Sequence, residues 1–211
     1  MNSNKNPMTE LNGADVYANW DSLVSTDKKN AEPQQNFDLS VDNLIADNGE
    51  EKWLKEFQKT NLPGMSLVAL KLLPTHAQPF KKTRAILAEQ IRTFLLTLPI
   101  HHMTDLRVAG LSEDQIANIS GGILPINWTI HLKYPLAYGG DVTADNFVLI
   151  PHHPFHEEIH RFLNQQLLTD AGVITPRVLY VPVVEGAVYV PFANTEMATE
   201  VKHIKLSGGP K

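Results

Sequence analysis

The sequence predicts an α+β fold, because it contains both short strand-like runs and amphipathic helical segments. NWTIHL and DNFVLI are apolar runs of strand length, and a long glycine-containing loop joins them. Apolar residues recur at helical spacing most clearly in KKTRAILAEQIRTFLLTL and in FHEEIHRFLNQQLL. The chain has 211 residues, 43% of them hydrophobic, which is enough for one ordinary domain with its own core. We expect that domain over residues 51–211.

Residues 1–50 differ from the rest in composition and are predicted to form an acidic, largely irregular segment. They are rich in Asn, Asp, Ser and Gln, and large apolar residues are few after Trp20. The first 52 residues hold ten acidic residues against four lysines, so the net charge of −5 arises there. Short helices at VYANWDSLV and LSVDNLIA are an open alternative. The segment is expected to be a solvated tail, a docking segment for a partner, or a trimmed remnant of a longer protein.

The first half of the domain is expected to be mainly helical. EEKWLKEFQKT places Trp53, Leu54 and Phe57 at helical spacing. SLVALKLL fits either a buried strand or a short helix, and the pattern does not decide. A helix that starts near residue 81 should end at Pro99. Its apolar side would hold Ile86, Leu87, Ile91, Phe94 and Leu95.

The second half is expected to carry the strands. Ser112 should cap a helix that Gly121-Gly122 ends. Pro154 fits the first turn of the helix in FHEEIHRFLNQQLL, where no amide hydrogen bond is needed. After Gly172, VITPRVLYVPVV and AVYVPF are predicted to form a strand pair around Glu185-Gly186.

Several classes of protein and site are disfavoured by what the sequence lacks. Cysteine is absent, which excludes disulfides and thiolate metal sites, so any metal must be held by His, Asp or Glu. No apolar run approaches about 20 residues, so no membrane span is expected. The N-terminus has no apolar stretch of signal-peptide length. Since the domain is near neutral, any nucleic-acid function must depend on local chemistry rather than on a basic surface.

Histidines are concentrated in one short stretch and suggest a metal site. Five of the nine lie between Asn127 and His160. His156 and His160 are four apart, which on a helix puts both on one face, and His131 at a strand end is a candidate third ligand. Three imidazoles with open positions for water are typical of catalytic rather than structural sites. Spacing alone is weak evidence, because two such helical histidines usually face solvent.

The residues around the histidines strengthen that hypothesis. The pattern IHxKxPLxxGGxxxxDNxVLI, followed by PxHxxxH, resembles the HNH (ββα-metal) endonuclease toxin domains. It is closest to the colicin-type DNases and to the HNH nuclease effectors associated with type VI secretion. The matching positions are His131, Lys133, Pro135, Leu136, Gly139, Gly140, Asp145, Asn146, Val148, Pro154, His156 and His160. The resemblance implies a ββα-metal finger over residues 127–168, with surrounding helices and the C-terminal strand pair.

The resemblance also implies roles and partners. His131, His156 and His160 would bind one divalent metal ion, Zn²⁺ or Mg²⁺. Asn146 would fix the loop and help to position a general base, and Gly139-Gly140 would form the turn. The activity would be metal-dependent hydrolysis of phosphodiester bonds in DNA.

Such an enzyme serves as an antibacterial toxin in interbacterial competition. The producer would make a cognate immunity protein. Delivery would need no signal peptide, with a secretion-system or adaptor partner engaging residues 1–50. The toxin would act in the cytoplasm of the target cell.

One position departs from the family pattern. The family's general base is a histidine directly after the first ligand, and this chain has Leu132 there. General-base catalysis contributes about 10²–10⁴-fold, and leucine cannot accept a proton. The chain is an inactivated variant, or another histidine (His153, His152 or the His101-His102 pair) is the base, or the alignment is off by one residue.

Further residues are candidates for contact with nucleic acid, namely Lys133, Arg161 and His152. Two other functions stay open beside the DNase. One is a non-catalytic binding protein that keeps the finger as a metal-stabilised scaffold. The other is an RNase toxin, because the same chemistry cleaves either phosphodiester.

Overall fold

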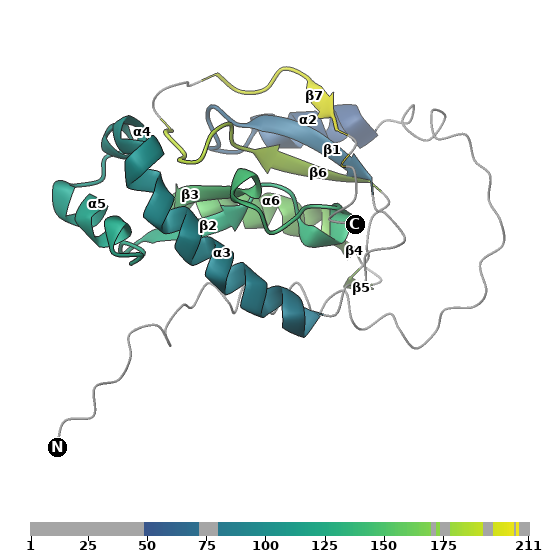
Figure 1. The fold of residues 1–211 in the computed structure, drawn as a ribbon. Coiled ribbons are helices and arrows are strands. Elements are labelled where there is room, and N and C mark those ends of the chain that lie inside the picture. The colour runs from purple at the N-terminus through teal and green to yellow at the C-terminus, as the bar shows by residue number, and fades with distance from the viewer. Residues whose placement is uncertain are drawn as a thin grey trace. The chain divides into compact units, whose positions relative to one another are not determined.

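The computed structural model describes residues 49–71, 80–169, 172–173, 178–191, 196–204 and 206. The chain divides into two units, Met1–Ser40 and Val41–Lys211, and the description below concerns the second. The short helices considered within residues 1–48 lie outside the described residues. The described part is α+β, as predicted, with helices around small sheets (Figure 1).

The larger sheet has three strands, with β1 (Ser66–Lys71) between β6 (Val178–Val183) and β7 (Val201–His203). SLVALKLL therefore begins with a strand, one of its two predicted alternatives. β6 is antiparallel to β1 and β7 is parallel to it. Pro182 is tolerated in β6 because that strand lies at the sheet edge. The predicted helix α2 (Gly49–Gln58) precedes this sheet and buries Phe57.

The predicted pairing of the two C-terminal runs is wrong. β6 pairs with β1, and the second run instead forms one parallel bridge, Val188 to Leu149. The Tyr189 amide donates to the Leu149 carbonyl at 2.9 Å, and the Tyr189 hydroxyl donates to the Pro63 carbonyl at 2.7 Å. Two apolar runs beside a glycine satisfy a hairpin pattern, but such a pattern does not encode which strand each run will join.

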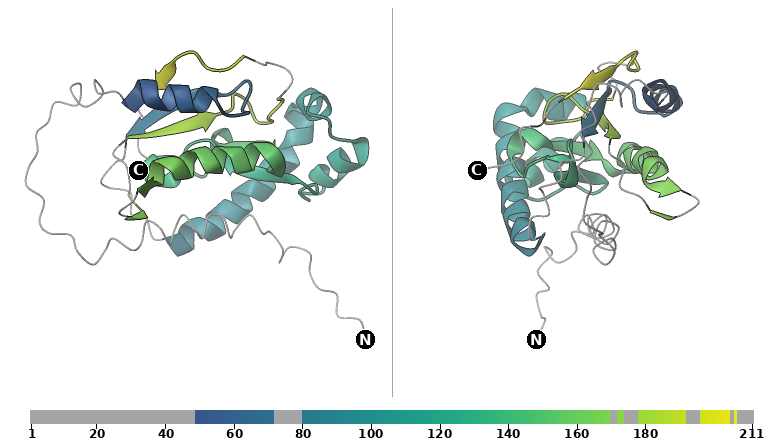
Figure 2. Two further views of the ribbon diagram at one scale, coloured as in Figure 1. Left: turned by 180° about the vertical axis from the view of Figure 1, so that it is seen from behind. Right: turned by 90° about the vertical axis from the view of Figure 1, so that its right-hand side faces the viewer.

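The second sheet is a hairpin of β2 (Trp128–Leu132) and β3 (Phe147–Pro151), in antiparallel register with His131 opposite Val148. Helix α3 (Phe80–His101) covers one face of this hairpin and helix α6 (Glu157–Leu167) covers the other (Figures 1 and 2). The rings of Phe94 on α3 and Phe147 on β3 meet edge to face, 5.5 Å between centroids. The hairpin is thus the middle layer of three.

Helix α3 departs from its prediction at two points. It continues through Pro99 to His101, and the His102 amide still donates to the Leu98 carbonyl at 2.7 Å. A proline so near the end removes a single ladder hydrogen bond, which the last turn tolerates. Ile86, predicted on the buried side, is 48% exposed, whereas Phe94 and Leu95 are buried. The apolar stripe is covered only where α3 lies against the hairpin and the helix α5 (Glu113–Ser120).

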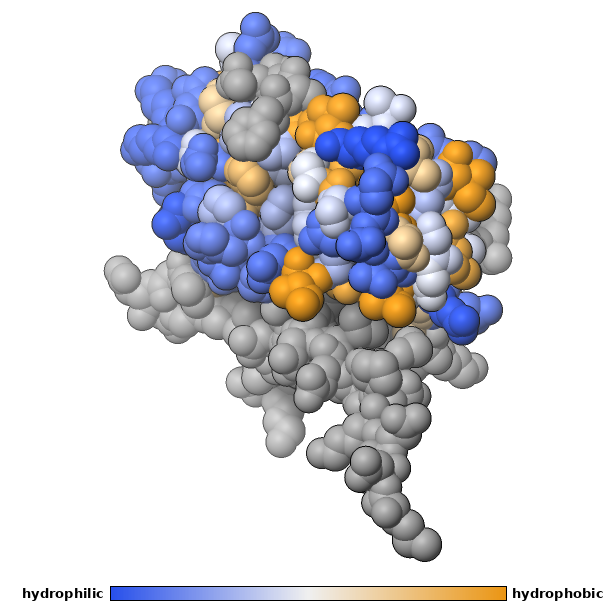
Figure 3. Space-filling model, turned by 90° about the vertical axis from the view of Figure 1, so that its left-hand side faces the viewer, coloured by the Kyte–Doolittle hydropathy of each residue, from blue (hydrophilic) through white to orange (hydrophobic). Residues whose placement is uncertain are grey.

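Two short helices, α4 (Met103–Val108) and α5 (Glu113–Ser120), follow α3. The predicted cap of α5 is confirmed: Ser112 accepts from the Gln115 amide, and the Gln115 side chain accepts from the Ser112 amide. Large exposed apolar side chains of the described residues all fall between residues 86 and 126, and Figure 3 shows the face on the α4–α5 side. They are Ile86, Leu96, Ile100, Val108, Ile123 and Ile126.

The helix that carries two of the histidines starts later than predicted. A wide turn, η6 (His152–His156), follows β3, with His153 in an extended conformation (φ −112°, ψ 136°), and α6 begins only at Glu157. Within this turn only His153 has non-helical φ and ψ, so Pro154 directly follows the break and lies in the turn that leads into α6, in keeping with the prediction for it. After α6 come the two-residue strands β4 (Leu168–Thr169) and β5 (Gly172–Val173), paired to each other.

Helix α6 is fastened to the larger sheet by one buried side chain. Gln166 donates to the Tyr180 carbonyl at 2.7 Å and accepts from the Tyr180 amide at 2.8 Å. The glutamine amide thereby satisfies the amide and carbonyl of Tyr180, which a neighbouring strand would otherwise bond at this edge of the sheet. Among the described residues, none of the helices has the length and apolarity that crossing a membrane requires.

Candidate metal centre

Three histidines from three successive elements converge between the hairpin and α6. His131 comes from β2, His156 is the last residue of η6, and His160 lies one turn into α6. One ligand nitrogen from each lies within 4.8 Å of the other two. The predicted trio therefore comes together, although His156 precedes the helix on which it was expected.

The three rings are arranged edge to face around a common point. Ring centroids are 5.3 Å apart for His131 and His156, 5.5 Å for His131 and His160, and 4.3 Å for His156 and His160. The Nε2 atoms of His156 and His160 face each other at 3.0 Å. One nitrogen of each ring is therefore close enough to the other two for all three to bind a shared cation.

His131 is the member that most needs a further partner. It is buried, and within the part of the chain that the structure describes neither its Nδ1 nor its Nε2 has a hydrogen-bond partner. Leaving a buried polar group unsatisfied costs about 1–3 kcal/mol, so native structures rarely do it without compensation. A cation bound to one nitrogen would supply that compensation, and this orphaned ring shows that the residues fit a metal ion.

The protonation states suit metal binding as well. Burial, followed by the nearby His156 and His160, holds the pKa of His131 well below its usual range. Burial lowers the pKa of His156 to about 3, with His160 and His152 as further causes, and lowers that of His160 to about 4. All three imidazoles are therefore neutral near pH 7, which is the form that binds metals.

Asn146 organises the loop between the two strands. This loop contains η4 (Leu136–Tyr138) and η5 (Ala144–Asn146). The buried Asn146 amide accepts from the Tyr134 amide at 2.7 Å and donates to the Tyr134 carbonyl at 2.9 Å and the Asp141 carbonyl at 2.7 Å. Both polar atoms of the side-chain amide are thus used in hydrogen bonds that close the loop.

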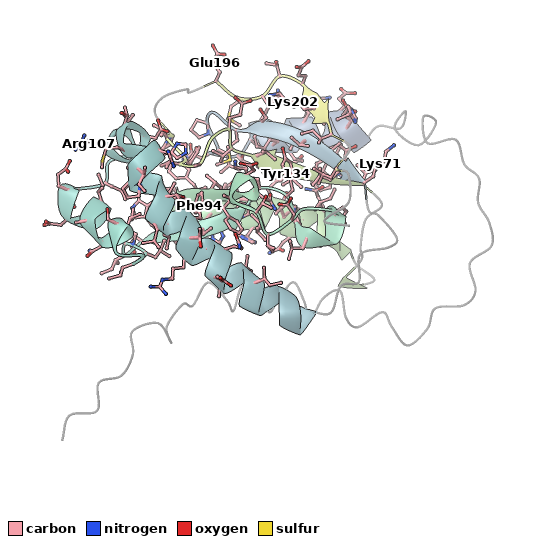
Figure 4. The ribbon with its side chains drawn as sticks, in the orientation of Figure 1. Lys71, Phe94, Arg107, Tyr134, Glu196 and Lys202 are labelled. Carbon is pink, nitrogen blue, oxygen red and sulfur yellow. The ribbon has the colours of Figure 1, made fainter. Side chains whose placement is uncertain are left out.

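The two glycines of that loop are required for different reasons. Gly139 has φ 92°, a left-handed conformation that favours glycine. A Cβ on Gly140 would lie 1.9 Å from the Tyr134 carbonyl oxygen, so no side chain fits there. Figure 4 labels Tyr134, around which the loop closes. No pattern in the sequence indicated Tyr134, because it acts through its backbone amide and carbonyl, which bond the Asn146 side chain.

Leu132 belongs to the apolar layer on the other face of the hairpin. It lies opposite Phe147 in the register, and the Phe147 ring packs on Phe94 of α3 (Figure 4). Successive residues of a strand point to opposite faces, so Leu132 points toward α3 while His131 points toward α6. Leu132 is only 4% exposed. Its leucine is thus explained by packing.

The histidines before α6 share a carboxylate that sequence reasoning missed. His153 Nδ1 lies 3.0 Å from Glu157 Oε2, and His152 Nδ1 lies 3.4 Å from Glu157 Oε1. The hydrogen bond with His153 holds the pKa of Glu157 below its usual value. The available signal was an acid four residues after a histidine at a helix start, which is a common and weak pattern.

The other candidates do not join the trio. The Lys133 ammonium donates to the Asp145 carbonyl at 2.9 Å, and burial lowers its pKa. Arg161 pairs with Glu158. His102 Nδ1 lies 3.1 Å from Asp105 Oδ2 at the start of α4, outside the metal group. The predicted nucleic-acid contacts therefore already have partners within the chain.

Comparison of the chain with protein-family models, with curated proteins and with solved structures gave no significant match. The resemblance to HNH nucleases therefore depends on the residue pattern alone.

Proposed function

We propose that this protein is a metal-dependent endonuclease of the HNH type, in which β2, β3 and α6 form a ββα-metal finger. The observation that carries the proposal is the buried His131, whose two nitrogens lack partners beside two further neutral imidazoles. A buried ring without hydrogen bonds would destabilise a protein in which it had only a structural role. At a site that binds a cation, the cation compensates for the missing hydrogen bonds.

Each part of the finger has a task in this proposal. His131, His156 and His160 would hold one divalent ion, Zn²⁺ or Mg²⁺, and burial keeps them neutral for it. When bound, such an ion offsets negative charge on the scissile phosphate and on the leaving oxygen. Asn146 keeps the loop closed, so that the end of β2 stays fixed relative to α6.

In this proposal the general base cannot be the residue directly after the first ligand and must come from another position. Leu132 cannot accept a proton and faces the apolar layer. His153 is 76% exposed, and the Glu157 carboxylate holds its Nδ1, which leaves Nε2 free to accept a proton. We therefore assign the base to His153, with His152 as the next candidate.

The alternative to the endonuclease is a non-catalytic binding protein, which the surroundings of three expected functional residues favour. The packed Leu132 and the internally paired Lys133 and Arg161 suit a non-catalytic binding protein that uses the metal only for stability. In that case the ion would still raise the melting temperature, and no phosphodiester would be cut.

The biological setting belongs to the same proposal. The enzyme would be an antibacterial effector acting on DNA in the target-cell cytoplasm, delivered without a signal peptide. A secretion-system or adaptor partner would engage residues 1–50, and a cognate immunity protein would protect the producer. An RNase toxin remains the alternative for the substrate.

The test is incubation of plasmid DNA and purified RNA with the metal-loaded protein, with and without chelator. We expect chelator-sensitive cleavage of DNA by the native chain and none by its His131→Leu variant. A Leu132→His variant is run alongside, and cleavage by that variant alone would mark the native chain as inactivated. If DNA and RNA both stay intact with the metal-loaded native chain and with the metal-loaded Leu132→His variant, the endonuclease is refuted and the binding protein is favoured.

A further inference from the structure

A fourth histidine lies at the edge of the metal group, and its main chain is fixed there. The His152 amide donates to the Asn127 carbonyl at 2.7 Å, directly after the last strand pair, Trp128 with Pro151. The hydrogen bonding of the hairpin therefore extends as far as His152. Its side chain is 48% exposed, so the ring can turn while the main chain stays in place.

The ring of His152 lies beside one member of the trio, His156, although His152 is not among the three residues whose ligand nitrogens all lie within 4.8 Å of one another. Its centroid lies 5.4 Å from that of His156, compared with 5.3 Å between His131 and His156. The other rings are buried or half-buried, whereas His152 is exposed. His152 is thus the neighbour of the trio that solvent reaches most readily, and its ring is the one most able to change partners.

Glu157 offers the same ring another partner. Its Oε1 lies 3.4 Å from His152 Nδ1, beyond a good hydrogen bond, while its Oε2 bonds His153 at 3.0 Å. The contact with His152 is the looser of the two. A small rotation of the His152 ring would break its contact with Glu157. The hydrogen bond between Glu157 and His153 would remain.

We propose that His152 is a fourth protein ligand of the bound cation, and that the Glu157 carboxylate competes with the cation for its ring. This inference rests on the metal site of the proposed function. With His152 bound, the ion has four nitrogen ligands, the closed set typical of structural sites. With His152 held by Glu157, one position is open to water or to a phosphate oxygen.

The experiment uses Co²⁺ as a spectroscopic probe on the full chain, since its visible absorption reports ligand number. Titrations give the Co²⁺ dissociation constant of the native chain and of the His152→Ala, His153→Ala and Glu157→Gln variants. We expect His152→Ala to weaken binding at least tenfold and to change the spectrum. His153→Ala is the comparison variant: it should keep the native spectrum and, because it frees Glu157 to hold His152 more firmly, should weaken binding by less than His152→Ala does. Glu157→Gln should bind more tightly than the native chain, because the competing charge is removed.

A second readout tests the open position directly. Azide or inorganic phosphate added to the Co²⁺ form should alter the spectrum of His152→Ala at concentrations that leave the native spectrum unchanged. Equal dissociation constants and equal anion responses in the native, His152→Ala and His153→Ala proteins would overturn the inference and leave the three-histidine site standing. Absence of Co²⁺ binding by the native chain would overturn the metal site itself, and with it both proposals.

Discussion

Replacing His131 with leucine should make the metal-free protein more stable and the metal-loaded protein less stable than the native chain. The ring is buried and both nitrogens are unpartnered, so the metal-free fold bears their desolvation with no hydrogen bond in return. Leucine fills similar space and has no polar atom. The sign of the effect therefore depends on whether the cation is present, which a purely structural histidine would not show.

The magnitude follows from general values for buried polar groups. Removing the unsatisfied imidazole should stabilise the metal-free protein by about 1–3 kcal/mol. For a unit of this size, each kcal/mol shifts the melting temperature by roughly 2–4 °C. A metal at 100 times its dissociation constant stabilises the native fold by about 2.7 kcal/mol, and the variant should lose that gain.

Thermal unfolding followed by circular dichroism, with chelator and then with Zn²⁺, measures both effects. His153→Leu is the matched control, since it removes an exposed histidine outside the trio and should keep the response to Zn²⁺. The reasoning would be refuted if His131→Leu lowered the melting temperature in chelator while Zn²⁺ still raised it. That result would mean that His131 is held by packing and does not bind the ion.

Other parts of the site give further predictions. Asn146→Ala removes three hydrogen bonds that close the loop and should lower the free energy of unfolding by about 2–4 kcal/mol in urea titrations; a change under 0.5 kcal/mol would argue against its fixing role. Gly140→Ala should destabilise the fold more than Gly186→Ala, which has open space and only its φ of 83° to oppose it; urea midpoints compare them, and equal losses would contradict the steric argument. The lowered pKa values of His156 and His160 mean that the unfolded chain takes up protons first, so the metal-free protein should lose stability as the pH falls from about 6.5 toward about 4. That loss should be about 3 kcal/mol for His160 alone, and denaturant unfolding between pH 7 and 4 would show a flat profile if the rings were solvated.

The success and failure of the sequence predictions have physical reasons. The three ligands were found because a strand end and a four-residue helical spacing restrict where side chains point, and both are local properties. The capped start of α5 was local in the same way. The strand pair around Gly186 failed because pairing is decided by distant partners, here β1 and Leu149.

The wide turn before α6 and the part played by Glu157 were also beyond sequence reasoning. A proline after two histidines fits a helix start, yet the chain needs the extended His153 before α6 can begin. Glu157 gains significance only from the two histidine rings beside it. The side of the hairpin that Leu132 faces likewise required the register with Phe147.

The Gln166 amide bonds α6 to β6, and so joins the helix that carries His160 to the larger sheet. Helix α6 carries His160 in its first turns and is bonded to β6 near its C-terminal end, so a cation bound at one end of the helix would also stabilise the contact at the other end. Slowed hydrogen exchange at the backbone amides of β6 and β1 should therefore accompany cation uptake, although neither strand contributes a ligand. Cation binding at the histidines would then be detectable in the larger sheet, which contributes no ligand.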